Sequence, residues 1–144
     1  MGRLSVPVIR LDFLLGIAYT DVVWEINLTD QTEEWFLSLG DVERRQITAA
    51  IDELEARGPV LGRPFVDRIK GSRHHNMKEL RSIGGNIRVL FAFDPNREAV
   101  LLIGGDKTGH WQRWYRENIP LADALYDEYL EQYDEDDQVE RRTP

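Results

Sequence analysis

Three short apolar segments near the middle of the chain constrain its fold more than any other feature. The segments MKELRSI, NIRVLFAF and EAVLLIGG are separated by residues 84–86 (GGN) and 94–97 (DPNR), which are strong turn signals. Strands joined by such brief links pair as antiparallel neighbours. Because side chains alternate along a strand, Val89 and Phe91 would face one side and Arg88 the opposite, open side. The sequence therefore predicts an antiparallel meander with one strongly apolar face.

Helical patterns flank these strands. After a short strand over residues 22–29, Asp30 is positioned to cap a helix that ends at Gly40, and Asp41 to cap a second helix that stops at Gly58. Pro120 would open a last helix, which buries a stripe of Leu121, Ala124, Leu125 and Tyr129. We expect an α+β fold: an N-terminal helical hairpin packed on a small, mainly antiparallel sheet, with a C-terminal helix.

The length of 144 residues allows one domain with appendages. We predict a loosely ordered N-terminal extension over residues 1–21, a compact domain over 22–133 and an acidic, disordered tail over 134–144. The chain has no Cys, which excludes disulfides, zinc–thiolate sites and a thiol nucleophile. Its apolar runs are shorter than the roughly 18–20 residues that cross a bilayer.

Basic residues concentrate in one part of an acidic chain. Residues 57–116 hold 12 Lys/Arg and 5 Asp/Glu, although the whole chain has a net charge of −8. All three His lie in the same segment. Such a zone favours binding to phosphate groups such as those of a nucleic acid. The alternative is a basic sheet face that is balanced by the acidic helices of the same domain.

The order of the predicted elements, with the motifs ELR, RVLFAF and LLIGGDKTG, resembles the RelE/ParE superfamily of toxins from bacterial type II toxin–antitoxin modules. The HigB-like branch is the most similar, and the resemblance covers residues 22–133. It implies a small cytoplasmic toxin that cleaves messenger RNA on the ribosome without a metal ion or other cofactor. The implied partner is an antitoxin with a helix-turn-helix domain, through which alone the toxin would reach operator DNA. No membrane partner is implied.

The resemblance also implies a catalytic set. Arg81 and Arg88 match positions that hold the scissile phosphate, and Glu79 matches the residue that some members use as the base. The basic loop after the last strand supplies Lys107 and His110. In such a reaction the 2′-hydroxyl attacks the adjacent phosphate, so a base, cations around the phosphorane and an acid at the 5′-oxygen are needed. His110 suits the acid, because an unperturbed imidazole titrates near neutrality.

Further residues are expected to contact RNA, since cations pair with phosphates and aromatic rings hold unstacked bases. They are Arg73, His74, His75, Lys78, Arg113, Tyr115 and Arg116. Trp111 and Trp114, three apart, are expected to pack into a core instead. Glu79 and Arg81 share a strand face and could simply pair with each other. The His spacings do not predict a metal site.

Two other functions stay open at this level. A ParE-like toxin would inhibit a DNA topoisomerase and cleave no RNA. A degenerate member would survive only as an antitoxin partner or as a regulator of its own operon.

Overall fold

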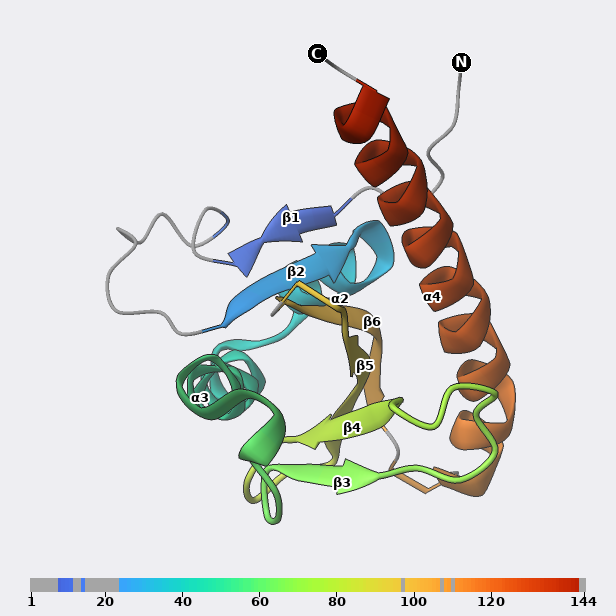
Figure 1. The fold of residues 1–144 in the computed structure, drawn as a ribbon. Helices are drawn as coiled ribbons and strands as arrows, with labels where there is room; N and C mark the ends of the chain where they lie inside the picture. The colour runs from blue at the N-terminus through green and yellow to red at the C-terminus, as the bar shows by residue number, and fades with distance from the viewer. Residues whose placement is uncertain are drawn as a thin grey trace.

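The predicted meander is the centre of a six-stranded sheet (Figure 1). The computed structural model describes residues 8–11, 14, 24–96, 98–106, 108–109 and 111–142, with the backbone alone for residues 10 and 133–142. Strands β4 (Lys78–Arg81), β5 (Ile87–Phe93) and β6 (Glu98–Asp106) pair antiparallel, as expected. The α+β fold class predicted from the sequence is confirmed.

Three further strands extend the meander on both sides. β3 (Val66–Arg68) pairs antiparallel with β4 and forms one edge of the sheet. On the other side, β2 (Glu25–Thr29) pairs parallel with β6, and β1 (Val8–Arg10) pairs antiparallel with β2. The resulting order is β1-β2-β6-β5-β4-β3. The parallel pair exists because two helices carry the chain from β2 back across the sheet before the meander begins.

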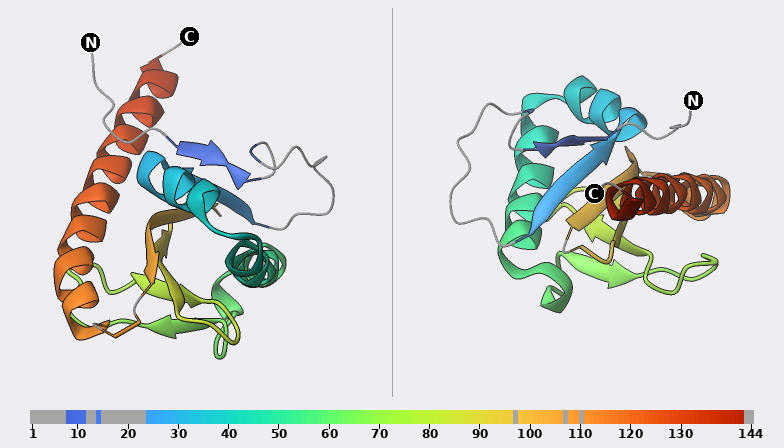
Figure 2. Two further views of the ribbon diagram at one scale, coloured as in Figure 1. Left: turned by 180° about the vertical axis from the view of Figure 1, so that it is seen from behind. Right: turned by 45° about the horizontal axis from the view of Figure 1, so that its top comes forward.

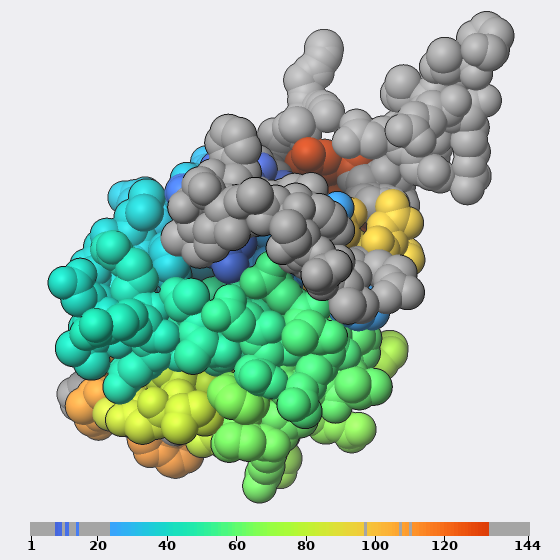
Figure 3. Space-filling view, turned by 90° about the vertical axis from the view of Figure 1, so that its left-hand side faces the viewer, coloured from blue at the N-terminus to red at the C-terminus, as the bar shows by residue number. Residues whose placement is uncertain are grey.

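Those helices are α2 (Asp30–Ser38) and α3 (Asp41–Arg57), followed by the 3₁₀ turn η1 (Gly58–Val60). Their N-caps lie one residue earlier than predicted. Thr29, not Asp30, caps α2, since its hydroxyl accepts a hydrogen bond from the Thr32 N–H at 3.2 Å. Gly40, not Asp41, precedes α3, with no side-chain cap. Figure 3 shows α3 and the segment after it as one continuous outer surface.

Each face of the sheet has its own hydrophobic core. The first core lies under α2 and α3, where Phe36 and Ile47 pack with Val89 and Phe91. The second contains Leu90 and other residues of the meander, and the C-terminal helix α4 (Trp111–Arg142) covers it (Figure 2). The alternation predicted for β5 is therefore confirmed. The expectation of an open second face is wrong, because α4 occupies it.

Helix α4 differs from its prediction in start, register and end. It begins nine residues before Pro120, which we expected at its start, and Pro120 lies inside it. The buried apolar residues are Ile119, Ala122, Tyr126 and Tyr129, whereas Leu121 is 54% exposed and Ala124 also faces solvent. Packing of the first turns of α4 on the sheet outweighs the cost of a proline in the helix interior. The backbone of residues 134–142, predicted as disordered tail, continues the helix.

The N-terminal extension is attached to the domain through β1. The side chain of Leu11, directly after this strand, is buried in the first core. The remaining residues of 1–21 lie outside the described residues, so the predicted boundaries at 22 and 133 stay predictions. Among the residues that the structure describes, none forms a helix long and apolar enough to span a membrane.

Candidate functional site

Three of the predicted site residues meet on the α4 side of the sheet. Glu79 comes from β4, Arg88 from β5 and Tyr115 from the first turns of α4. The Tyr115 hydroxyl donates a hydrogen bond of 2.5 Å to Glu79 Oε1, and Arg88 Nε lies 3.8 Å from the same oxygen. Glu79 and Arg88 are 7% and 5% exposed. We name Glu79, Arg88 and Tyr115 the central triad.

The pKa of Tyr115 lies well above its ordinary value, first because of burial and then because the hydroxyl donates to the Glu79 carboxylate. The Arg88 charge acts in the opposite direction, but less strongly. The phenol therefore keeps its proton at neutral pH and stays a hydrogen-bond donor. This donor and a nearby guanidinium fix the position of the Glu79 carboxylate.

Arg88 is more enclosed than the sequence suggested. Its Nη1 donates to the carbonyls of Gly85 and Ile87, at 3.3 and 2.9 Å, while its Nε has no hydrogen-bond partner. We expected this side chain on an open face, but the N-terminal turns of α4 cover it. Arg88 is thus a fixed cation beneath the site surface, with one donor unused.

Arg81 pairs with a residue that the sequence pattern did not single out. Its Nη1 lies 3.7 Å from Asp67 Oδ2 on the neighbouring edge strand β3. The same carboxylate oxygen accepts from Arg63 Nη2 at 3.0 Å. The alternative pairing of Arg81 with Glu79 does not occur, because Glu79 turns to Tyr115 and Arg88.

A pocket of about 550 Å³ opens beside the central triad, between the β3 edge and the start of α4. Its lining combines cations, two carboxylates, two aromatic rings and two isoleucines: Arg63, Asp67, Arg68, Ile69, Lys70, Glu79, Trp111, Tyr115 and Ile119. Only Glu79 and Tyr115 of these residues were predicted for the site, and its charged residues Arg63, Asp67, Arg68 and Lys70 were missed from the sequence. The only signal for them was the local excess of basic residues.

Two consecutive glycines of β6 allow a helix to approach each face of the sheet, α2 at Gly104 and α4 at Gly105. A Cβ on Gly104 would overlap the indole of Trp35, and one on Gly105 would overlap the indole of Trp114 on the opposite face. Trp114 packs as expected, whereas Trp111 is 50% exposed at the pocket. Gly105, shortly before the loop from β6 to α4, is the register partner of Arg88. Lys107 and His110, predicted in this loop, lie outside the described residues.

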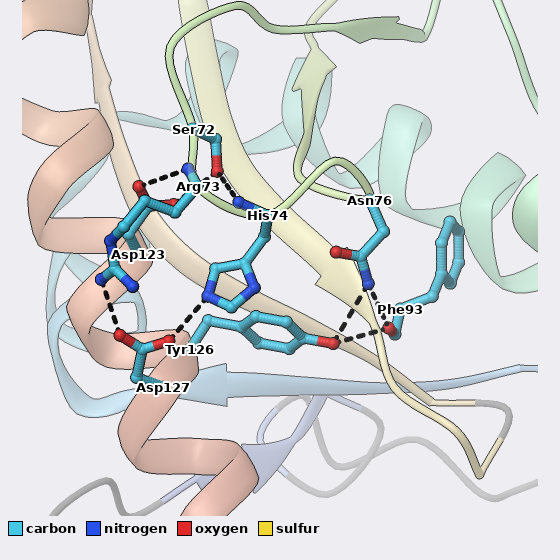
Figure 4. A network of polar contacts seen from close by, with 8 residues as sticks. All are labelled: Ser72, Arg73, His74, Asn76, Phe93, Asp123, Tyr126 and Asp127. Atoms are coloured by element: carbon cyan, nitrogen blue, oxygen red, sulfur yellow. Dashed lines mark hydrogen bonds and ion pairs between the residues drawn. The ribbon is translucent and has the colours of Figure 1, made fainter.

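Arg73 and His74 belong to a polar network that joins the β3–β4 loop to α4 (Figure 4). Arg73 Nη2 donates to Asp127 Oδ2 at 2.6 Å, and His74 Nε2 lies 2.7 Å from Asp127 Oδ1. Asp123 accepts from the Ser72 hydroxyl and from the Arg73 N–H, at 2.5 and 3.0 Å. Neither Arg73 nor His74 lines the pocket. Their predicted RNA contacts stay predictions, and the structure gives both a role in docking the loop.

The other predicted RNA-binding residues are dispersed. His75 is exposed in the β3–β4 loop. Lys78 lies on the face opposite to Glu79, with its Nζ 5.7 Å above the Phe93 ring. Arg113 and Arg116 are exposed on α4 and line a shallow hollow of about 240 Å³ on the outer side of Trp111.

Within the part of the chain that the structure describes, no group of three or more His, Asp or Glu side chains is arranged to hold a metal ion. The polar groups that the pocket does present are its cations, its carboxylates and the Tyr115 hydroxyl.

Comparison with known proteins identifies the family. The model of the family "Phage derived protein Gp49-like (DUF891)" matches residues 34–127. Putative toxin HigB3 of Mycobacterium tuberculosis (strain ATCC 25618 / H37Rv) is 54% identical over 105 residues, which are 73% of this chain and 92% of that protein. Putative toxin HigB2 of the same organism is 46% identical over 131 residues, which are 89% of this chain but 64% of HigB2.

A solved structure was also found. The archaeal RelE–RelB complex from Pyrococcus horikoshii OT3 contains a chain with 19% sequence identity and a TM-score of 0.47, which covers 60% of this chain and 98% of that one. The family match and the HigB relatives carry the assignment without it. The chain belongs to the Gp49-like family, whose members are toxins of the RelE/HigB type.

Proposed function

We propose that this chain is the toxin of a type II toxin–antitoxin module and cleaves messenger RNA without a metal ion. Family membership and the relatives named as putative toxins support the first part. The observation that carries the second part is the central triad, in which a buried carboxylate is held between a phenol and a guanidinium at the edge of a basic pocket.

In the proposed reaction Glu79 is the general base. Its carboxylate takes the proton of a ribose 2′-hydroxyl, whose oxygen forms a bond to the adjacent phosphorus. The bond from phosphorus to the 5′-oxygen of the next nucleotide breaks, which leaves a 2′,3′-cyclic phosphate. Arg88 and Arg81 stabilise the negative charge that develops on the phosphorane oxygens. The departing 5′-oxygen takes a proton from His110, and Lys107 adds charge at the phosphate, as the family resemblance implies.

Tyr115 has a positioning role in this scheme. Its hydroxyl holds Glu79 Oε1 toward the pocket, and its raised pKa keeps that hydroxyl protonated over the physiological range. Glu79 Oε2 then remains available to approach a 2′-hydroxyl. A fixed base and fixed cations lower the cost of reorganisation during the reaction.

The proposed partners follow from the family. An antitoxin with a helix-turn-helix domain would neutralise the toxin and bring it to operator DNA. The substrate would be messenger RNA on the ribosome, in the cytoplasm.

The test is induction of the wild-type chain in a bacterial host, with mapping of new RNA 5′ ends. Glu79→Gln should abolish new ends in translated frames and restore growth, and Tyr115→Phe should reduce cleavage by roughly tenfold or more. Arg45→Ala, at an exposed residue of α3, is the matched control and should cleave as the wild type does. Growth arrest with intact messenger RNA would contradict the nuclease and favour a ParE-like toxin. Full activity of Glu79→Gln would contradict the role of the base.

A further inference from the structure

The pocket beside the central triad has a second rim, which the proposed reaction does not use. This β3 rim consists of Arg63, Arg68 and Lys70, which lie on or beside the edge strand. One of these cations, Arg63, lies together with Arg81 close to a further carboxylate of the lining, that of Asp67. In Figure 1 this edge and the first turns of α4 lie at the same end of the molecule.

Asp67 occupies the position that an anionic ligand would take. Its Oδ2 lies 3.0 Å from Arg63 Nη2 and 3.7 Å from Arg81 Nη1, and its Oδ1 accepts from the Arg68 N–H at 2.9 Å. Two guanidinium groups and a backbone N–H around two oxygens match the way proteins bind phosphate. The side chain of Arg63 is more exposed than those of Asp67 and Arg81, so it can turn from Asp67 to a ligand at little cost.

The other two residues of the β3 rim, Arg68 and Lys70, are available to a ligand. Neither Arg68 nor Lys70 forms an ion pair with any other residue that the structure describes, and both are exposed. Single-stranded nucleic acid supplies a row of phosphates to such a strip of cations, and release of counterions favours the complex.

The opposite wall of the pocket is apolar and aromatic. Helix α4 contributes Trp111 and Ile119 to it, and Trp111, which also borders the hollow beside Arg113, is 50% exposed. An exposed indole next to branched aliphatic side chains is a platform on which an unstacked base can lie. A phosphate-sized cluster of donors and a base-sized wall thus face each other across one pocket of about 550 Å³.

We propose that this pocket binds a nucleotide of single-stranded RNA that neighbours the scissile phosphate. The nucleotide's own phosphate displaces Asp67 from Arg63 and contacts the β3 rim, while its base stacks on Trp111. Asp67 is a resident counter-ion that holds the cations in place and weakens RNA binding. This inference rests on the proposed function, since it names a substrate contact of the same site.

The test measures binding separately from cleavage. A fluorescent RNA oligonucleotide of about ten nucleotides, with 2′-O-methyl groups in place of the attacking hydroxyls, is titrated with the full chain at several salt concentrations. Asp67→Asn should bind roughly threefold more tightly or better, because it removes a negative charge next to the phosphate. Arg68→Ala with Lys70→Ala should weaken binding and lower the salt slope by about 0.7 for each phosphate that the variant no longer neutralises.

Trp111→Leu should weaken binding at all salt concentrations without changing the salt slope, since stacking releases no counterions. Arg45→Ala is the control for a cation removed from an exposed surface, and a melting curve shows that each variant folds. Unchanged or weaker binding by Asp67→Asn would overturn the inference, as would an Arg68/Lys70 variant that binds like Arg45→Ala. Absence of binding at low salt would also overturn it.

The two proposals fail in different ways. A wild type that cleaves RNA, with rim variants that bind normally, refutes the pocket and leaves the nuclease. A wild type that never cleaves, with rim variants that respond as expected, refutes the nuclease and leaves an RNA-binding pocket. Variants that lose binding to intact ribosomes, but not to the oligonucleotide, would assign the β3 rim to the ribosome and overturn the inference.

Discussion

Replacing the charges of Glu79 and Arg88, singly and together, tests the buried half of the site. Arg88→Met removes the guanidinium but keeps an unbranched side chain, and Glu79→Gln keeps an oxygen that can accept from Tyr115. The side chains are 6% and 9% exposed for Arg88 and Glu79, and the closest atoms of the pair lie 3.8 Å apart. At an effective dielectric constant of about 20, two charges at this separation attract by about 4 kcal/mol.

The single and double variants should therefore differ in a definite order. Arg88→Met leaves the Glu79 carboxylate buried with the Tyr115 hydroxyl as its remaining partner, and should lower the free energy of unfolding by about 3–5 kcal/mol. The double variant buries no charge at this point and should recover about 2–3 kcal/mol of that loss. The hydrogen bonds from Arg88 to Gly85 and Ile87 are absent from both variants, so they cancel in the cycle.

Urea unfolding followed by tryptophan fluorescence measures these differences. With an m-value of about 2 kcal/mol per molar urea, Arg88→Met should unfold about 2 M earlier than the wild type, and the double variant about 1 M earlier. If the two single effects add to within about 0.5 kcal/mol, the pair does not interact and its geometry is refuted. The double variant has a further use: it should fold but cleave no RNA, which separates loss of activity from loss of stability.

Two further predictions concern how α4 is held. Gly105→Ala should destabilise the domain by about 2–4 kcal/mol and reduce cleavage, because its Cβ would overlap the Trp114 indole. Gly62→Ala is the control: its Cβ would meet nothing within 4 Å, so it should change the melting temperature by less than about 2 °C. Equal changes in melting temperature for the two variants would contradict the packing of Trp114 on Gly105. The hydrogen bond from Arg73 holds the pKa of Asp127 below its ordinary value. Its stabilising effect is therefore complete above about pH 4 and lost as the pH falls below that, so Asp127→Asn should flatten the acid limb of thermal stability, and an unchanged limb would contradict the network in Figure 4.

The sequence predicted the sheet better than the helix that covers it. The meander followed from two local signals, short apolar runs and the turn residues between them, and neither depends on distant contacts. The start of α4 depends on contacts across the chain. Pro120 is a strong local sign of a first turn, yet Trp114 packs on Gly105 and Tyr115 binds Glu79 before it. Tertiary packing of this kind overrides local propensity.

The candidate site shows the same difference between what sequence positions predict and what depends on contacts between distant residues. Glu79, Arg81 and Arg88 were predicted from the family resemblance, which matches positions along the strands, but it did not predict the residues that each of them contacts. Glu79 faces Leu90 in the pairing of β4 with β5, and Arg81 faces Arg88, so the short contact of Glu79 with Arg88 is diagonal. A diagonal contact depends on side-chain direction, which a strand pattern does not specify.

The residues of the β3 rim could not be predicted individually, because they lie in a Gly/Pro-rich segment without periodicity. Only their combined positive charge could be recognised, as the excess of basic residues in the segment 57–116. The structure divides that excess into cations with different environments: Arg73 is tied to Asp127, Arg88 is enclosed beside Glu79, and Arg68 and Lys70 remain exposed at the pocket. A charge count treats these residues as equal, although exposed cations can bind a phosphate directly, whereas the enclosed Arg88 acts on a phosphate from beneath the surface and also fixes the position of Glu79. The effects of their substitution should therefore differ in kind: loss of Arg68 or Lys70 should change RNA affinity and its salt dependence, whereas loss of Arg88 should change the stability of the domain first.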